Sequence, residues 1–419
     1  MINVVGAGIV GLSVAWALVR RGEAVRVFDR DEPGKGASFG NSGSLSAGSV
    51  VPLATPGVAR SGLKMLFDAD APLVVRRSYL LRALPWLAQF ARVSDAATVR
   101  GLAQSLLAIL APTLPAWRQV LVDIDGLDLL RETGQMHVYP SRAALDADAF
   151  AWRLRRESGV RTEFLQRDEL LALQPGIGPA YSHGVFLPDA ATITDPHGLC
   201  VRMAAALSAG GAEFVRAPVQ ALGTDGRVHA QGRDWPARAC VVAAGAWSAQ
   251  LLGALGVRVP LESQRGYHVQ RPGNLVDAGV ELLRPVVAAD ARVFIVPMRE
   301  GARVGGTVEF AGLRAQVDAR RFELLRRSFS RVFPGAPAAP AGAAEHTWMG
   351  HRPCLPDTLP VLGPLPGAPG LWAAFGHGHL GLTMSAVTGA WLADALMGRP
   401  DPALRHFALE RPTLGARRA

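Results

Sequence analysis

The hydrophobic pattern of the first thirty residues predicts a strand, a turn, a helix and a second strand. Residues 3–5 are a short apolar run typical of a buried strand. Residues 12–21 form an Ala-, Leu- and Val-rich helical segment that ends at Gly22, a favourable residue after a helix. Residues 24–28 then alternate between apolar and polar positions, as a half-buried strand does. This order predicts the opening unit of a Rossmann-like parallel sheet.

Gly6, Gly8 and Gly11 lie in the predicted turn between the first strand and the helix, in the spacing GxGxxG. Glycines there permit a tight turn, a close approach of the backbone to a pyrophosphate and close packing of the helix on the strand. Asp29 follows Gly11 by eighteen residues and closes the second strand, where a carboxylate accepts hydrogen bonds from a ribose. A glycine-rich surface turn would leave Asp29 unexplained. The pattern therefore predicts a dinucleotide site, with NAD and FAD both open.

Downstream, the apolar periodicity predicts further helices and strands. Residues 61–122 are helix-rich, with leucine and tryptophan stripes more typical of a core than of a site, and residues 134–139 resemble a strand. Residues 240–244 form a buried strand that breaks at Gly245 just before a helix, which predicts a second cofactor contact at the carboxyl edge of the sheet. Residues 259–333 indicate strands and one helix.

Two other segments are rich in small residues. Residues 31–58 are too long for a simple connection, which favours a backbone wrapped closely around a large ligand over a flexible linker. Residues 376–383 read GHGHLGLT and have the same character. Because the glycine-rich segments are spread over the whole chain, one domain must be assembled from at least three separated pieces.

Composition and charge exclude several classes of protein. A chain of 419 residues with 49% hydrophobic residues suits two or three folded domains. Its three cysteines are far apart, which argues against a disulfide framework or a zinc knuckle and fits a reducing cytoplasm. The net charge of +9 favours anionic partners, but the basic residues are scattered, so we do not expect nucleic acid binding. No apolar run reaches the length of a membrane span, and Arg20 and Arg21 follow the N-terminal apolar stretch, whereas those of a signal peptide precede it.

Motifs along nearly the whole chain resemble the D-amino-acid oxidase/dehydrogenase (DAO) family of FAD-dependent oxidoreductases, and within it the bacterial D-amino-acid dehydrogenase small-subunit type. The matching segments are VVGAGIVGLSVAWALVRRG with FDR, GNSGSLSAGSVVPLATPGV, KMLFDADAPLVVR, AAGAWS, GHRPCLPDTLPVLG and GHGHLGLTMS. The resemblance implies an α/β fold with an interrupted, Rossmann-like FAD-binding domain over 1–92, 189–258 and 345–419. A substrate domain of mixed, mostly antiparallel sheet with helices would comprise 93–188 and 259–344.

The resemblance also implies non-covalent FAD, with its adenine ribose on Asp29, its pyrophosphate over the three glycines, and residues 41–48 and 376–383 around the isoalloxazine. The expected cofactor-binding residues are Gly6, Gly8, Ile9, Val10, Gly11, Asp29, Arg30, Ser38, Asn41, Ser42, Gly43, Ser44, Val219, Ala244, Gly245, Trp247, Gly376, His377, Gly378, Leu380, Gly381, Leu382 and Thr383. We expect no metal, because His377 and His379 have no carboxylate or cysteine cluster beside them in the sequence. Cys354 does not fall at the family position of a covalent flavin tether.

By resemblance, Arg352 is the leading catalytic residue. In this family the arginine of the GxRP motif clamps the substrate carboxylate, and a planar guanidinium suits a carboxylate bidentately. The alternative is a structural arginine that caps a loop. Where some family oxidases add a tyrosine hydroxyl, this chain has Phe294, so Tyr267 is the candidate for a second carboxylate contact. His379 replaces the threonine that is commoner in the family, which indicates a contact with flavin or substrate and a shifted substrate preference.

We therefore expect FAD-dependent oxidative deamination or dehydrogenation of a D-amino acid, with D-proline and 4-hydroxy-D-proline as candidate substrates. Hydride would pass from Cα to flavin N5, positioning would supply most of the catalysis, and electrons would continue to a quinone or another carrier. The alternatives are an oxygen-using glycine- or sarcosine-type amine oxidase, a non-catalytic FAD subunit of a hetero-oligomer, and an NAD(P)-dependent reductase, which the single glycine fingerprint disfavours. We expect a cytoplasmic protein of undetermined oligomeric state, in which residues 62–93 fit either peripheral contact with the inner membrane or packing on the FAD-binding domain.

Overall fold

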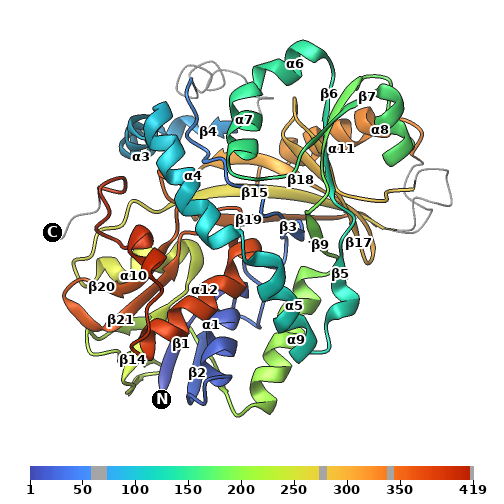
Figure 1. Ribbon diagram of the computed structural model, residues 1–419. Coiled ribbons are helices and arrows are strands. Elements are labelled where there is room, and N and C mark those ends of the chain that lie inside the picture. Colours follow the sequence, from blue (N-terminus) through green and yellow to red (C-terminus); the bar gives the residue numbers. More distant parts are fainter. Residues whose placement is uncertain (58–72, 273–280, 337–343, 416–419) are drawn as a thin grey trace.

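Two large β-sheets organise the chain (Figure 1). The structure is a computed structural model that describes residues 1–57, 73–272, 281–336 and 344–415. One sheet combines strands from the N-terminus, the middle and the C-terminal part of the chain, and the other combines mid-chain strands with one early strand and one strand from the C-terminal part. Each sheet is assembled from segments that lie far apart in the sequence, as the spacing of the glycine-rich segments predicts.

The first sheet has six strands in the order β10-β2-β1-β14-β21-β20. They are β1 (Ile2–Val5), β2 (Val25–Asp29), β10 (Glu213–Arg216), β14 (Ala239–Val242), β20 (Val361–Leu365) and β21 (Ala368–Phe375). All neighbours are parallel except β20 and β21. The predicted strand–helix–strand opening is confirmed, with α1 (Ile9–Val19) between β1 and β2.

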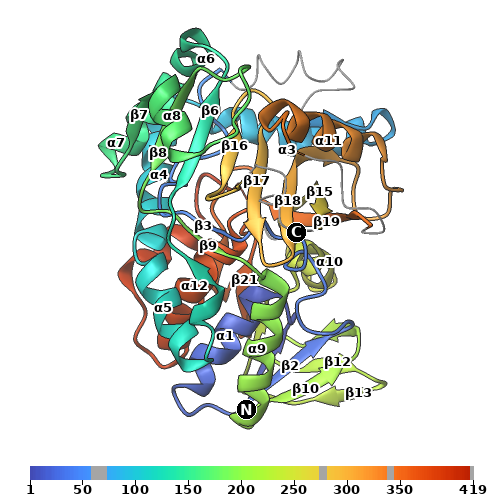
Figure 2. The same ribbon diagram turned by 90° about the vertical axis from the view of Figure 1, so that its right-hand side faces the viewer.

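Both faces of this sheet are covered (Figure 2). Val4 of β1 packs in the core formed with α1, α9 (Pro196–Ala209) and α12 (Gly381–Leu396). Val5 packs on the opposite face, with residues of β12 (Val228–Ala230) and β13 (Arg233–Trp235). Burial on both faces explains why all four residues of β1 are buried without alternation. Its one polar residue, Asn3, donates a hydrogen bond to the carbonyl oxygen of Trp235 at 3.0 Å.

Helices α1 and α12 cross in close contact on one face of the sheet. Gly389 permits this approach, because a Cβ there would lie 2.3 Å from the carbonyl oxygen of Ser13. Helices α4 (Ala96–Leu110) and α5 (Thr113–Asp123) also contact α12. Among the described residues, the stretch Ala96–Asp123 is long and apolar enough for a membrane span by length and composition alone, and it contributes Leu102, Leu106 and Trp117 to the buried core.

The second sheet has nine strands in the order β19-β15-β18-β17-β16-β6-β8-β7, with β4 beside β18. They are β4 (Leu73–Val75), β6 (Gln135–Tyr139), β7 (Glu163–Gln166), β8 (His183–Leu187), β15 (Glu262–Arg271), β16 (Val286–Ala288), β17 (Val293–Met298), β18 (Gly301–Phe310) and β19 (His346–Cys354). Most pairs are antiparallel, and β6 with β16 and β4 with β18 are parallel. The sheet is therefore mixed and mostly antiparallel, as expected. One of its faces packs on α11 (Arg320–Val332).

Smaller elements complete the described fold. Two three-stranded sheets have the orders β11-β12-β13 and β3-β9-β5. The remaining elements are β3 (Ser44–Leu45), β5 (Leu130–Arg131), β9 (Ala191–Ile193), β11 (Val219–Leu222), η1 (Arg77–Tyr79), α3 (Leu80–Arg92), η2 (Leu127–Leu129), α6 (Arg142–Ala147), α7 (Ala149–Glu157), α8 (Arg167–Leu173), η3 (Gly245–Trp247), α10 (Ser248–Gly253) and η5 (Pro402–Phe407).

The sheet pairing differs from the predicted domain division in two places. The prediction assigns residues 345–419 to the FAD-binding domain, but β19 pairs with β15 along its length and so belongs to the second sheet. The prediction assigns α4 and α5 to the substrate domain, but both helices pack against α12, which covers one face of the first sheet. Such pairings between distant segments leave no local mark in the hydrophobic pattern. The other boundaries stay a prediction.

The segment 62–93 is described only in part, because residues 62–72 lie outside the described residues. Helix α3 buries Ala83 and Trp86, and Trp86 Nε1 donates a hydrogen bond to the carbonyl oxygen of Cys354 at 3.3 Å. Leu81 on the same helix is 81% exposed. One face of α3 therefore packs on the protein, and peripheral membrane contact stays a prediction.

The substitution Gly389→Ala tests the crossing of α1 and α12. The added methyl group would overlap the Ser13 carbonyl, and overpacking costs about 1–3 kcal/mol, so we expect a lower midpoint of thermal unfolding. Gly101→Ala in α4 is the matched control, because a Cβ at Gly101 meets no atom within 4 Å and alanine has the higher helix propensity. Equal midpoints for Gly389→Ala and the unsubstituted protein would contradict the close crossing.

Candidate active site

The turn between β1 and α1 has the geometry that its glycines predict. Gly6 has a φ of +113°, and a Cβ there would lie 2.3 Å from the carbonyl oxygen of Ala243. A Cβ on Gly11 would lie 1.8 Å from the carbonyl oxygen of Gly6, so the helix packs directly on the turn. Gly8 directly precedes helix α1 and has no side chain to cap it, and the backbone N–H of Ile9 donates a hydrogen bond to Ser38 Oγ at 2.9 Å. The first turn of α1 therefore suits a phosphate, which N–H groups at a helix N-terminus bind.

Asp29 lies at the end of β2 and reaches back to this turn. Its Oδ2 accepts a hydrogen bond from the backbone N–H of Ala7 at 2.6 Å, and its Oδ1 accepts one from Asp31 N–H at 3.0 Å. Burial is the main cause of the raised pKa of the Asp29 carboxyl. A carboxylate has about four lone-pair sites, so Asp29 fixes the glycine turn and can still accept hydrogen bonds from ribose hydroxyls.

The turn opens into a cavity of about 1200 Å³ that is lined by residues of both large sheets. Ligand pockets are commonly about 300–1,000 Å³, so this cavity suits a molecule as large as a dinucleotide together with a small substrate. Most of the expected cofactor-binding residues line it: Gly6, Gly8, Ile9, Val10, Asp29, Arg30, Ser38, Asn41, Ser42, Ser44, Val219, Ala244, Gly245, Trp247, His377, Gly378, Leu380, Gly381, Leu382 and Thr383. Their contacts with FAD stay a prediction.

Three of the expected cofactor residues serve backbone packing instead of lining the cavity. Gly11 lies against the Gly6 carbonyl, as above. Gly43 has a φ of +70°, and a Cβ there would lie 2.1 Å from the carbonyl oxygen of Ile193. Gly376 has a φ of +84°, and a Cβ there would meet a methyl group of Leu355 at 2.4 Å. These glycines do not line the cavity, but they allow the close packing of the segments that form its wall.

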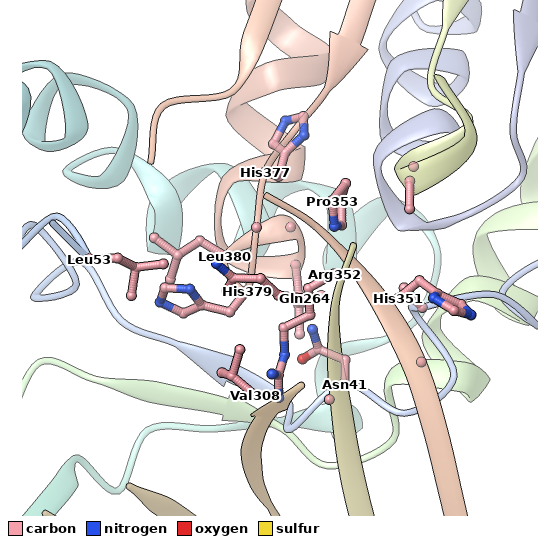
Figure 3. Close-up of a pocket in the computed structure, with 18 of the residues that line it drawn as sticks. Asn41, Leu53, Gln264, Val308, His351, Arg352, Pro353, His377, His379 and Leu380 are labelled. Carbon is pink, nitrogen blue, oxygen red and sulfur yellow. The ribbon is translucent and has the colours of Figure 1, made fainter. Parts of the chain in front are cut away.

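Arg352 enters the cavity from β19, across the face of the second sheet (Figure 3). In the β15–β19 pairing Arg352 lies opposite Gln264. Its guanidinium lies over Gly266, where a Cβ would be 2.3 Å from Arg352 Cζ. Gly266 is therefore needed for the path of the arginine side chain. Figure 3 shows Gln264, Val308 and His379 around Arg352.

A β-bulge in β18 supplies the hydrogen-bond acceptor for Arg352. The register between β15 and β18 shifts between the Arg265–Glu309 and Tyr267–Gly306 pairs. The extra residue of β18 is Thr307, with a φ of +56°. Its carbonyl oxygen accepts a hydrogen bond from Arg352 Nη1 at 3.0 Å. A β-branched residue in this left-handed conformation is uncommon and strained.

Arg352 has no carboxylate partner among the described residues, and Thr307 supplies its one described hydrogen bond. The arginine is half-buried, and what remains accessible faces the cavity. Burial lowers the pKa of Arg352. A guanidinium stays charged at neutral pH in proteins, so the cavity contains a positive charge that a bound anion would neutralise.

Tyr267 does not lie beside Arg352. Tyr267 is among the residues that line the cavity, but successive side chains of a strand point to opposite faces, so its ring lies on the other face of β15 from Arg352. The Tyr267 hydroxyl donates a hydrogen bond to Glu309, and its ring packs edge-on against Phe322 of α11. The predicted second carboxylate contact by Tyr267 is therefore corrected: its hydroxyl is held by Glu309 in the core on the far side of the sheet.

The two histidines of GHGHLG have different surroundings. His377 is buried, and its Nε2 hydrogen-bonds to Thr388 Oγ1 of α12 at 3.1 Å. His379 is exposed to the cavity. The pKa of His379 is lowered from 6.5 to about 4. The main cause is loss of hydration inside the protein, and the positive charge of Arg352 is the second cause. His379 and Arg352 thus lie near each other in the cavity (Figure 3), and His379 is neutral at physiological pH.

Several lining residues were not predicted from the sequence. Gln264 and Thr307 stand beside Arg352, and Gln135 and His137 of β6 line the same cavity. Gln135 accepts a hydrogen bond from Ser44 at 3.0 Å and contacts His137 Nε2 at 3.0 Å. The one signal in the sequence for these residues is the alternation of side chains along a strand. That alternation predicts which residues share a face of the sheet, but not which face lines a cavity. In the described part of the chain, no three His, Cys, Asp or Glu side chains gather as a metal site would require.

A Rossmann-like sheet whose glycine turn opens into a cavity shared with a second sheet defines a dinucleotide-dependent oxidoreductase. The chain belongs to the FAD dependent oxidoreductase (DAO) family, whose sequence profile matches residues 1–395. FAD is therefore its cofactor. The glycine turn, the start of α1 and Asp29 fit that group, and FAD supplies the chemistry of a hydride acceptor when bound.

The chain is similar to curated enzymes over nearly its full length. It is 36% identical over 418 residues to a D-amino-acid oxidase of Bradyrhizobium diazoefficiens, covering 98% of each chain. It is 33% identical over 427 residues to D-amino acid dehydrogenase 2 of Ralstonia nicotianae, covering 98% of this chain and 100% of the relative. Among solved structures, glycine oxidase from Geobacillus kaustophilus has a TM-score of 0.72 at 24% identity, covering 98% of each chain, which shows the shared fold.

The substitution Asp29→Asn tests the assigned FAD end of the cavity. It removes the charge that accepts two backbone N–H groups, and hydrogen bonds to charged groups contribute about 1.5–3 kcal/mol, so we expect FAD affinity to fall about tenfold to hundredfold. Dissociation constants follow from titration of the apoprotein with FAD. Glu32→Gln is the control, because exposed Glu32 pairs with Arg216 and its loss should change affinity less than about twofold. Equal affinities for both variants would contradict the role of Asp29.

Proposed function

We propose that this FAD-dependent oxidoreductase oxidises a D-amino acid by transfer of its Cα hydride to FAD, and passes the electrons to a quinone or another carrier. The observation that carries the proposal is the guanidinium of Arg352, which faces the cavity and has no carboxylate partner among the described residues. The same sheet contains a second buried arginine, Arg265, which has its own carboxylate partner, Glu309, at 2.9 Å. Because a buried charge is costly without a partner, Arg352 is suited to the carboxylate of a ligand.

In this mechanism the protein acts mainly by position. The Thr307 carbonyl holds one edge of the guanidinium, and the remaining N–H groups of Arg352 bind the substrate carboxylate. A fixed carboxylate restricts the orientation of Cα, and such restriction can supply several kcal/mol of the barrier reduction. The names of the two curated relatives support a D-amino acid as the substrate.

The walls near Arg352 support an apolar substrate side chain. Val308 of β18 lies beside the arginine (Figure 3). Val75 of β4 and Leu80 and Leu87 of α3 pack in one cluster with Val308 and also line the cavity. A second carboxylate placed against such a wall would lose its hydration without a partner. We therefore place D-proline first among the candidate substrates, with 4-hydroxy-D-proline second.

Substrate preference is tested with a panel of D-amino acids mixed with the holoenzyme in the absence of oxygen. We expect D-proline and other apolar D-amino acids to bleach the flavin at least about tenfold faster than D-aspartate, because burying an unpaired carboxylate costs more than about 1.4 kcal/mol. Bleaching is followed by absorbance. A faster reaction with D-aspartate would exclude the apolar assignment, and no bleaching by any member would favour the non-catalytic FAD subunit.

The carboxylate clamp is tested by Arg352→Gln. We expect flavin reduction by the best substrate to slow by at least about a hundredfold, because charge-assisted hydrogen bonds to the substrate are lost, while FAD content is unchanged. Arg142→Gln is the control, since Arg142 is an exposed partner of Asp146. Equal reduction rates for the two variants would assign Arg352 to a structural role.

The electron acceptor needs a separate measurement, because one curated relative is named an oxidase and another a dehydrogenase. The expected result for a dehydrogenase is rapid reduction of a quinone analogue without oxygen and little hydrogen peroxide under air. The comparison uses one substrate at one concentration with both acceptors. Peroxide formed in equal amount to oxidised substrate would identify the oxygen-using amine oxidase instead.

A further inference from the structure

The loop that follows β21 holds His379 in a fixed relation to Arg352. Gly376 and Gly378, with φ values of +84° and +56°, fold the loop into a tight turn. The backbone N–H of Gly378 donates a hydrogen bond to the carbonyl oxygen of Pro353 at 2.8 Å. Pro353 directly follows Arg352 in β19. The histidine and the arginine are therefore positioned by one hydrogen-bonded unit.

His379 is the imidazole of this turn with free hydrogen-bonding capacity. His377, two residues earlier, is buried and bonded to Thr388. His379 faces the cavity, and no described side chain or backbone group hydrogen-bonds to its ring. A neutral imidazole has one acceptor nitrogen and one donor N–H. Leu53, Leu380 and Val308 are apolar side chains near Arg352, and Gln264 and Asn41 are further polar side chains that Figure 3 labels there.

A substrate held at Arg352 needs a hydrogen-bond acceptor for its amino group. Arg352 has only donors, and one of the two lone pairs of the Thr307 carbonyl oxygen already accepts from the guanidinium. Among the described residues, Arg352 forms no ion pair with a carboxylate, and its hydrogen bond is to the Thr307 carbonyl. Hydride transfer requires the neutral form of the amino group. That form has the lone pair that must become the imine bond as hydride leaves.

We propose that His379 accepts a hydrogen bond from the amino or imino N–H of the substrate while Arg352 holds the carboxylate. The two residues then bind the two polar groups on Cα and fix its orientation by two points. This inference rests on the proposed amino acid oxidation and assigns a binding role within that same site. Gln264 is the competing acceptor, because its amide lies near Arg352 and also lines the cavity.

Two planar carboxylates of matched shape test the inference on the holoenzyme. Pyrrole-2-carboxylate has a ring N–H beside the carboxylate, and furan-2-carboxylate has a ring oxygen in the same place. Their dissociation constants are measured from the change in flavin absorbance on binding, without turnover. For the unsubstituted protein we expect pyrrole-2-carboxylate to bind about threefold to tenfold more tightly, the range of one neutral hydrogen bond.

Substitutions assign the effect to one side chain. His379→Leu should reduce the ratio of the two dissociation constants to about one, His379→Asn should restore part of it by supplying an amide oxygen, and Gln264→Leu should leave it unchanged. Furan-2-carboxylate binding by each variant shows that the cavity is intact. A ratio unchanged in His379→Leu, or lost in Gln264→Leu, would overturn the role of His379 and leave the carboxylate clamp standing. If neither ligand alters the flavin spectrum of the unsubstituted protein, the carboxylate site and this inference both fail.

Discussion

The site depends on a single hydrogen bond between the guanidinium of Arg352 and the carbonyl oxygen of Thr307. A charged group in the interior must be fixed by acceptors or paired with an anion. One β-bulge supplies an acceptor from the backbone, at the cost of a strained threonine, and leaves the rest of the guanidinium for a ligand. On the other face of the sheet, Glu309 neutralises Arg265. In this sheet Arg265 thus has a carboxylate partner, whereas Arg352 has none among the described residues.

The two halves of the molecule are joined where this chemistry takes place. The loop after β21, from the first sheet, bonds to β19 of the second sheet through Gly378 and Pro353, and His377 and Cys354 form a β-bridge beside it. His377 also anchors the loop to α12 through Thr388. The glycine turn after β1 and the strand that holds Arg352 are therefore parts of one connected framework around the cavity.

Local sequence patterns predict a residue's role most reliably where that role depends on the conformation of the backbone at the residue itself. Gly6 and Gly11 have no room for a side chain because strand and helix meet there, and the spacing alone predicts this. Asp29 likewise follows from its position at the end of β2. Tyr267 shows the limit: its polar hydroxyl suggested a contact with substrate, but the sequence does not state which side of β15 faces the cavity. The hydroxyl belongs to the Glu309 cluster.

The sequence by itself determined the dinucleotide fold, its interrupted assembly, the arginine and the histidines, because each rests on short-range spacing or on motifs of a known family. Only the tertiary structure decided which of these residues meet. The register of β19 against β15 sets Arg352 over Gly266, and the bulge at Thr307 turns a carbonyl toward it. Register and bulges arise from pairing between strands far apart in the chain, and such pairing is fixed by the packing of both sheet faces and not by any one segment.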